Sequence, residues 1–423
     1  MFSELSSFFD FFIRIFLIFG KVWFLILPTF SWFLFKNLWG RHAAIGWLMT
    51  QNDILLEIIP PQDVEKSPKI MEGFFNALAA TDAGMNKFAQ YALGKMNPYF
   101  SLELVGSEGA AHFYIRTPAF FRDLVESALY AQYQGVEIFQ VDDYTGNIPA
   151  LIPNDEWTLW GADWTLLKDD AYPIKTYKYF DEDVTGKMID PLANYMEIIS
   201  TLGPNQHLWL QYVVQPDRPQ WFDEWGKTTV DEFLGKNNEK FGFFDRFFYD
   251  VKEIVKNIFP ALFGPVEFSS LESPATDEQP LEFRLTPGEK QTLASLEENI
   301  AKSMFSVKAR ILCIGRKENF SMINVAGASA MLKEFSDNHT NQFIPVDRSK
   351  TYADYVNVDA RKGSRMRRIL ERYRDRDDSG VTFHLSTTEL ATVFHLPDMS
   401  IVSPSVQFSS ARRGGAPTNL PTT

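Results

Sequence analysis

The stretch Tyr99–Pro118 reads YFSLELVGSEGAAHFYIRTP and decides the fold of this chain. It contains two strand-like runs, Tyr99–Val105 and Ala111–Arg116, which are rich in aromatic and branched residues. The linker Gly106–Gly109 (GSEG) separates them, and a short glycine-containing linker between such runs is typical of a β-hairpin. The sequence therefore predicts a hairpin here.

The segments on either side of this hairpin complete a regular order of elements. Before it, Asp53–Ile59 (DILLEII) predicts a strand, and Ser67-Pro68 predicts a helix start with a hydroxyl N-cap and proline at the first position. After it, Thr117-Pro118 predicts the start of a second helix, and Val136–Val141 predicts a last strand. The resulting order, β-α-β-β-α-β, is typical of a ferredoxin-like unit.

The same order recurs later in the chain with an insertion. The second set of predicted elements runs strand, helix, strand, strand, helix, strand over Ile174–Phe180, Asp190–Gly203, His207–Val214, Val307–Gly315, Phe320–Phe335 and Gln342–Val346. A helical insert at about 219–303 interrupts this set. The predicted fold class is therefore α+β, with an N-terminal transmembrane helix followed by tandem ferredoxin-like units and a helical insertion.

Four domains follow from this reading. We expect a membrane anchor over 1–40, a first ferredoxin-like domain over 50–145 and a second one over 150–350 that carries the insert. Residues 351–423 hold a basic helix, a C-terminal strand and helix, and a flexible tail.

The amino terminus is strongly apolar. The run Ile15–Phe35 is long enough for a spanning helix, which needs about 20 apolar residues. Glu4 and the lack of a small-residue cleavage site argue against a signal peptide. A helix would place Asp10, Arg14 and Lys21 on one face, so an amphipathic helix lying in the membrane interface is an alternative. A buried apolar hairpin in a soluble protein is a third reading, and the spanning helix is favoured.

Composition narrows the functional classes. With 15% aromatic residues and 22% charged ones, the 423-residue chain has the composition of a folded protein. Its net charge of −13 argues against general coating of nucleic acid, though not against one local basic patch. The single cysteine, Cys313, excludes internal disulfides and cysteine-rich zinc sites.

Motifs that would support catalysis or ligand binding are absent or incomplete. Gly226–Thr228 (GKT) resembles the end of a phosphate-binding loop, but Trp221 stands where its first glycine belongs. The segment 181–186 (DEDVTG) resembles the start of a calcium loop, but the twelfth position is Leu192 instead of glutamate. The six histidines show no ligand spacing: His42, His112, His207, His339, His384 and His395. We therefore predict no enzyme activity, no cofactor and no metal.

The most distinctive local feature is Arg361–Arg376 (RKGSRMRRILERYRDR), which carries a net charge of +6 in an acidic chain. Its apolar residues recur at i, i+3, i+4 and i+7, which predicts a basic amphipathic helix. The candidate interaction residues lie on a neighbouring stripe: Arg361, Arg365, Arg368, Arg372 and Arg376. They could contact nucleic acid, an anionic membrane surface or an acidic partner. Alternatively, they pair with the acidic surface of their own protein.

Several segments carry a resemblance to a known family: Asp53–Pro61 with Ser67-Pro68, Phe100–Leu104 with Phe113–Pro118, Gln206–Pro216, Leu385–Pro397 (LSTTELATVFHLP), Pro404-Ser405 and Asn419–Pro421. Together they resemble an uncharacterised bacterial domain family, frequent in candidate-phyla bacteria. In that family the domain is found ahead of conjugative-transfer or type IV secretion ATPases. The resemblance covers most of residues 45–423, and its motifs are structural rather than catalytic.

In those relatives the segment matching Glu389–Pro397 leads into a P-loop motor domain, whereas this sequence ends at Thr423. The resemblance implies a non-catalytic scaffold or adaptor of a type IV secretion-like or conjugative DNA-transfer machine, with the ATPase on a separate chain. We expect a single-pass protein of the cell membrane whose soluble part is cytoplasmic. Expected partners are the lipid bilayer, that ATPase and further copies of the chain. The alternative is a nucleic-acid-binding module that uses 361–376.

Overall fold

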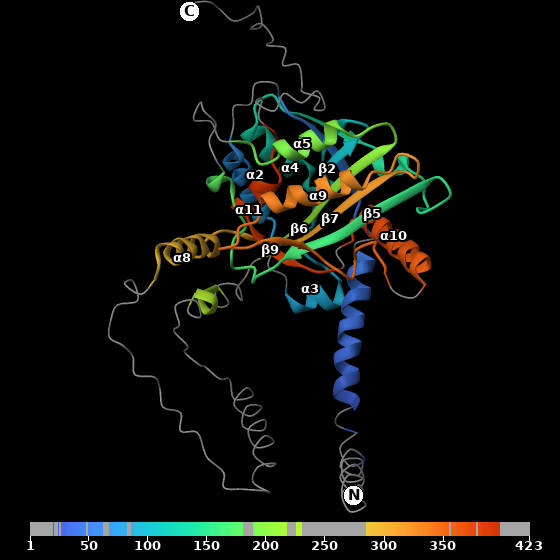
Figure 1. Cartoon of the computed structure of the whole chain (residues 1–423). Coiled ribbons are helices and arrows are strands. Elements are labelled where there is room, and N and C mark those ends of the chain that lie inside the picture. The colour runs from blue at the N-terminus through green and yellow to red at the C-terminus, as the bar shows by residue number, and fades with distance from the viewer. Residues whose placement is uncertain are drawn as a thin grey trace, which may run out of the picture.

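The computed structural model describes residues 20, 24, 27–47, 50–61, 67–82, 86–180, 189–217, 226–230, 285–354, 357–377 and 380–397. Among these residues, nine strands form one antiparallel sheet with helices against both of its faces (Figure 1). The strands lie in the order β4-β1-β3-β2-β6-β7-β5-β8, and β9 also pairs with β7. The predicted α+β class is confirmed, with a large antiparallel sheet as its centre.

Apart from an additional short helix at Lys87–Ala92 and two short 3-10 helices, the first half of the sheet follows the predicted order of elements. These elements are β1 (Asp53–Ile59), η1 (Pro68–Ile70), α2 (Met71–Ala79), α3 (Lys87–Ala92), β2 (Phe100–Ser107), β3 (Ala110–Pro118), η2 (Ala119–Phe121), α4 (Arg122–Gln132) and β4 (Glu137–Val141). The Ser67 side chain accepts a hydrogen bond from the backbone N–H of Lys69, as the predicted N-cap requires. The strands lie in the order β4-β1-β3-β2, and every neighbouring pair is antiparallel.

The hairpin between β2 and β3 is tighter than the sequence suggested. Ser107 pairs with Ala110, so only Glu108 and Gly109 remain in the turn. Both have positive φ, 52° and 89°, as a type I′ turn requires. Gly106 belongs to β2, where a Cβ would lie 2.6 Å from the side chain of Ile199.

The second half of the sheet repeats the first. Its elements are η3 (Tyr144–Asn147), β5 (Trp157–Leu166), η4 (Tyr177–Tyr179), α5 (Ala193–Ser200), β6 (Gln206–Asp217), α8 (Pro287–Ile300), β7 (Met304–Arg316), α9 (Met322–Glu334) and β8 (Phe343–Pro345). Apart from the short 3-10 helices and α8, the order is again β-α-β-β-α-β, and the strands lie in the order β6-β7-β5-β8. The halves join through β2 and β6, which pair from Phe100↔Val214 to Ser107↔His207.

One predicted strand is wrong. The first strand of the second half is β5, whereas we assigned it to Ile174–Phe180, which contains the short helix η4. The backbone of that segment bonds to side chains instead of to a strand: the N–H of Ile174 donates to Glu389 and the N–H of Tyr177 donates to Thr392. Its apolar residues are buried by this contact, which imitates the pattern of a strand.

The sequence of β5 gives only a weak strand signal, because Gly161 and Asp163 are poor strand formers. Packing requires the glycine, and the aspartate forms ion pairs with Arg310 and Arg372. A Cβ at Gly161 would lie 2.4 Å from the side chain of Leu312 and 3.2 Å from that of Ile369. The tertiary contacts therefore override the local propensity of this strand.

The two faces of the sheet bury different cores. One core lies under α2, α4, α5, α9 and α11 (Thr387–Val393), and it runs through both halves of the sheet. The second is smaller and lies under α10 (Val358–Arg374) on the opposite face. The predicted boundary between two ferredoxin-like domains stays a prediction, since the described sheet and its larger core are continuous across it.

A helix at 27–47 projects from one end of the body (Figure 1). Within the described ranges, none of the helices combines the length and the hydropathy needed to cross a membrane. Several expectations concern residues outside these ranges: most of Ile15–Phe35 before residue 27, the 181–186 loop, most of the 219–303 insert and the tail after residue 397.

The segment with the family resemblance forms β9 (Phe383–Ser386) and α11 (Thr387–Val393), and every residue of α11 is buried. A capping box of Ser386 and Glu389 begins the helix. The Glu389 carboxylate accepts hydrogen bonds from the N–H groups of Ser386 (2.7 Å) and Ile174 (2.9 Å). Burial raises its pKa from 4.5 to about 7, although these hydrogen bonds oppose the rise.

This pKa predicts an unusual pH dependence of stability. Because the pKa of Glu389 is higher in the folded chain, its contribution is fully present below pH 4.5 and is lost as the pH rises to about 7. Over that interval, the unfolding free energy of Glu389→Gln should gain on the order of 3 kcal/mol relative to wild type. Urea unfolding at several pH values measures this difference. Glu297→Gln, on the exposed side of α8, is the control, and parallel curves for wild type and Glu389→Gln would contradict the prediction.

Candidate functional site

The predicted basic helix is present as α10, and its apolar stripe packs as expected. Met366, Ile369, Leu370 and Tyr373 are all buried. They contact the smaller core, which includes Trp209 of β6. The helix therefore lies on the sheet through its apolar face, which leaves the question of where its arginines point.

The candidate arginines do not form one exposed stripe. Arg361 and Arg368 are exposed on the outer side of α10. Arg365 is partly buried and donates hydrogen bonds to the carbonyl oxygens of Lys350 (3.1 Å) and Tyr352. It therefore ties the helix to the preceding loop.

The last two candidate arginines form ion pairs within the protein. The Nη1 atom of Arg372 lies 2.6 Å from a carboxylate oxygen of Asp163. The Nε atom of Arg376 lies 2.9 Å from a carboxylate oxygen of Glu103, and its Nη1 atom pairs with Asp143. For these two arginines the alternative reading, pairing with acidic groups of the same chain, describes what the structure shows.

Arg376 differs most from its expected position. The helix ends at Arg374, and Arg376 adopts the left-handed conformation with φ of 49°, so helical periodicity does not apply to it. Its side chain is 2% exposed, which places the guanidinium under the helix end instead of on the outer stripe. The left-handed turn is what directs this side chain toward the sheet.

The partners of these arginines belong to a row of polar residues that crosses the sheet. Glu103 of β2 pairs with Gln211 of β6, Gln211 with Arg310 of β7, and Arg310 with Asp163 of β5. All four are buried. We call Glu103, Gln211, Arg310 and Asp163 the polar row. It connects the two halves of the sheet beneath α10.

Hydrogen bonds run along the whole polar row. Gln211 donates to Glu103 (3.1 Å) and accepts from Nη1 of Arg310 (3.1 Å), while Nε of Arg310 donates to Asp163 (3.2 Å). Gln211 also donates to the carbonyl oxygen of Tyr373 at the end of α10 (3.0 Å). The row therefore satisfies its own buried groups and holds the helix end at the same time.

The charged residues of the polar row and the arginines paired with them shift one another's pKa values. Burial alone would raise the pKa of Glu103, but the charge and hydrogen bonds of Arg376 hold it below the ordinary value. Burial would lower the pKa of Arg376, yet Glu103 and Asp143 raise it. The pKa of Arg310 is lowered by burial and by Arg372, and Asp163 offsets part of this effect. Glu103 and Arg376 therefore form an ionised pair, which we call the clamp. The clamp is a structural ion pair instead of an acid–base site.

Sequence reasoning missed the polar row. The available signal was a charged residue in the middle of an apolar strand, such as Glu103 in FSLELV or Arg310 in VKARILCIG. Such residues are seldom fully buried unless they are paired. That rule predicts partners for them but does not identify which ones.

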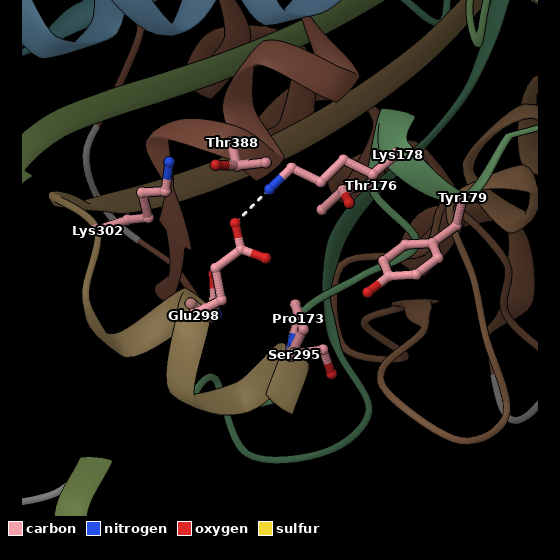
Figure 2. Close-up of a pocket in the computed structure, with 9 residues that line it drawn as sticks. Pro173, Thr176, Lys178, Tyr179, Ser295, Glu298, Lys302 and Thr388 are labelled. Carbon is pink, nitrogen blue, oxygen red and sulfur yellow. Dashed lines mark hydrogen bonds and ion pairs between the residues drawn. The ribbon is translucent and has the colours of Figure 1, made fainter. Parts of the chain in front are cut away.

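A second candidate lies where α8 meets the segment around η4. Figure 2 shows Lys178 and Glu298 pointing toward each other across this pocket, as an ion pair. On the adjacent side, Nζ of Lys302 lies 3.3 Å from Glu72, which also accepts a hydrogen bond from the hydroxyl of Tyr177 (2.7 Å). Each carboxylate is thus paired with a lysine, so neither is poised as a general base.

A cavity of about 130 Å³ adjoins this pocket. Its lining includes Asp337 and His339, but the carboxylate of Asp337 accepts the backbone N–H of His339 (2.8 Å) in a local turn. The described residues contain no cluster of three or more histidine, cysteine or acidic groups suited to a metal ion. These contacts fasten α8 to the body and form no catalytic arrangement.

Four of the six histidines each lie within hydrogen-bonding distance of a side chain from a distant segment. His112 lies 2.8 Å from Glu57, His207 lies 2.9 Å from Ser107, and both belong to the sheet. Two further contacts join C-terminal histidines to acidic residues: His384 to Asp170 (2.9 Å) and His395 to Asp190 (3.0 Å). Each pair links segments far apart in the sequence, as expected of structural histidines.

The protein is therefore of the mixed α+β class and is organised around one antiparallel sheet. The chain belongs to the family described as a domain of unknown function (DUF8128), whose model matches residues 49–409. None of the curated proteins compared with the chain matches it. The prediction of an uncharacterised family is confirmed, and helix 27–47 lies ahead of the matched residues.

The clamp predicts unequal effects for two arginines of the predicted stripe. Arg376→Met leaves Glu103 as a buried, unpaired charge and should lower the unfolding free energy by about 3–5 kcal/mol. Arg368→Met removes an exposed side chain and should change it by no more than about 0.5 kcal/mol. Urea unfolding near neutral pH measures both changes. Because the pKa of Glu103 is lower in the folded chain, its pairing with Arg376 stabilises the fold above the pKa of the unfolded chain. This stabilisation is lost as the pH falls through the lowered pKa of the folded chain.

A rescue variant separates charge from packing. Adding Glu103→Gln to Arg376→Met removes the unpaired charge, so the double variant should be more stable than Arg376→Met alone. Equal stability of Arg376→Met and Arg368→Met would show that the clamp contributes nothing.

Proposed function

We propose that this protein is a membrane-attached scaffold or adaptor, in which helix 27–47 reaches the bilayer and the sheet-based body offers a docking platform. The observation that carries the proposal is the exposure of apolar side chains all around this helix. Trp32, Phe33, Leu34 and Phe35 follow one another and are 67%, 63%, 48% and 54% exposed. Successive helical residues point about 100° apart, so these four cover the whole circumference.

Such a helix is suited to an apolar environment. Exposed apolar surface is unfavourable by roughly 25 cal/mol per Å², and a helix that is apolar on all sides is typical of a protein core or a membrane. The body contacts the helix closer to its C-terminal end, where the indole N–H of Trp39 donates to the carbonyl oxygen of Tyr91 (2.8 Å). The N-terminal turns project away from the body and are available to lipid (Figure 1).

The larger setting is part of the same proposal. The chain works in a type IV secretion-like or conjugative DNA-transfer machine, beside a separate P-loop ATPase. It is a single-pass protein of the cell membrane with a cytoplasmic body, and it associates with further copies of itself. The resemblance of segments such as Leu385–Pro397 supports this setting. That segment is buried as α11, which gives it a structural role in this chain.

Vesicle flotation tests the attachment. The full-length protein should float with phosphatidylcholine vesicles and remain bound at high salt, because the contact is apolar. Phe30→Asp/Phe33→Asp should reduce flotation strongly, since a carboxylate in the bilayer costs roughly 2.5–3.5 kcal/mol. The matched control is Phe120→Asp/Ile323→Asp, which changes two highly exposed apolar residues of the body and should float like wild type. Wild-type protein that stays with the soluble fraction, or equal flotation of both double variants, would contradict the proposal.

A second candidate function is binding of single-stranded nucleic acid by the outer side of α10. The observation that favours it is the exposure of Arg361, Lys362, Arg367 and Arg368 along one helix. Arg367→Gln/Arg368→Gln should weaken binding of a labelled oligonucleotide and reduce its salt dependence, without loss of stability. Fluorescence anisotropy at several salt concentrations measures this, and unchanged binding would remove α10 as the contact.

A further inference from the structure

The short helix α3 (Lys87–Ala92) lies against helix 27–47 at the end of the body from which that helix projects (Figure 1). The contact is close and specific. Nζ of Lys36 lies 5.0 Å from the ring centre of Tyr91, and Gly94 has a positive φ of 64°. A Cβ at Gly94 would lie 2.0 Å from the carbonyl oxygen of Ala43, so only glycine fits there. The position of α3 along helix 27–47 is therefore defined.

This junction exposes apolar side chains beside basic ones. Phe88 and Leu93 are 71% and 51% exposed on and just after α3. On the neighbouring helix, Trp39 is also exposed although its indole N–H is bonded to the body. Aromatic side chains with a polar contact at one end are enriched where proteins cross the membrane–water interface.

The charge of the same junction is opposite to that of the chain. Residues 36–47 and 86–95 contain Lys36, Arg41, Lys87 and Lys95 and no acidic residue, whereas the whole chain carries −13. Lys36, Arg41 and Lys95 are exposed. Basic residues beside a membrane segment are attracted to anionic headgroups, and this attraction adds up over several residues.

From these observations we propose that Lys36, Trp39, Arg41, Phe88, Leu93 and Lys95 form a headgroup collar that binds anionic phospholipid and seats the body on the membrane surface. The inference rests on the proposed membrane attachment and names the lipid class that it selects. The collar is set by the docking of α3, which brings residues 88–95 beside residues 36–43.

The described part of the helix agrees with this placement. Residues 27–35 precede the first lysine of the collar and extend about 13 Å at 1.5 Å per residue, roughly half of a hydrocarbon core. Lys36 and Arg41 can then reach the headgroups while their aliphatic stems remain beside apolar neighbours. The same two charges interrupt the apolar character of this helix.

Environment-sensitive probes test the position of the collar in the full-length protein. The natural cysteine, Cys313, is buried and its thiol pKa is raised to about 12, so it should remain unlabelled. Probes at Phe88→Cys and Leu93→Cys should be quenched by headgroup-attached quenchers in vesicles that contain phosphatidylglycerol. A probe at Ile323→Cys, an exposed position on α9, should remain in water.

A charge variant tests the lipid class. Arg41→Gln/Lys95→Gln should weaken binding to phosphatidylglycerol vesicles by roughly tenfold and leave binding to pure phosphatidylcholine unchanged. Lys317→Gln/Lys333→Gln, with the same loss of charge at two exposed positions of the body, should retain the preference. Lys36 is left intact in both variants because it also contacts Tyr91.

The outcomes separate this inference from the proposed function. If the protein floats but probes at 88 and 93 stay in water with both lipid mixtures, the collar is wrong while membrane attachment stands. The same conclusion follows if the two charge variants lose anionic preference equally, or if wild type shows none. If wild type binds neither kind of vesicle, both proposals are wrong.

Discussion

A carboxylate with no exposed surface, Glu103, lies on β2 at the line where the two halves of the sheet join, and the surrounding structure is arranged around its charge. An unpaired charge in this position would cost several kcal/mol. Arg376 supplies the opposite charge and does so from a left-handed conformation that arginine rarely adopts. The ion pair therefore offsets local strain in the backbone and determines where α10 ends on the sheet.

The same requirement couples the two halves. The polar row continues from Glu103 through Gln211 and Arg310 to Asp163, one residue on each of four neighbouring strands. Neighbouring residues of a strand face opposite sides of a sheet, so a slip of one residue between β2 and β6 would move Glu103 away from Gln211 and Arg376. Apolar packing alone tolerates such slips more readily than a buried charge does. The row is thus a device that specifies one register for the joined sheet.

Most elements could be predicted from the sequence because their signals are local: capping residues, prolines, and apolar runs with the period of a strand or helix. The misassigned strand shows the limit, since Gly161 and Asp163 serve contacts with distant residues, while Ile174–Phe180 imitates a strand by packing on α11. The position of Arg376 differs from the expected one for a similar reason. Helical spacing placed Arg376 on an outer stripe, but the helix ends at Arg374 and the next turn reverses the direction of the side chain. The periodicity of the helix carries no information about the position of a buried carboxylate on a distant strand, such as Glu103.

The distribution of charge gives the proposed attachment a direction. A chain of net charge −13 is repelled as a whole by an anionic surface, so its basic regions approach such a surface more closely than the rest. The headgroup collar is such a region, and it lies beside helix 27–47, whose N-terminal turns expose apolar side chains on every side. Exposed apolar residues elsewhere, such as Phe120 and Ile323, lack this combination of a projecting apolar helix and an acid-free basic border. On the proposed orientation, repulsion and attraction act together to hold the acidic body away from the lipid while the helix enters it. The surfaces of the body that point away from the collar are then the ones left available to other proteins.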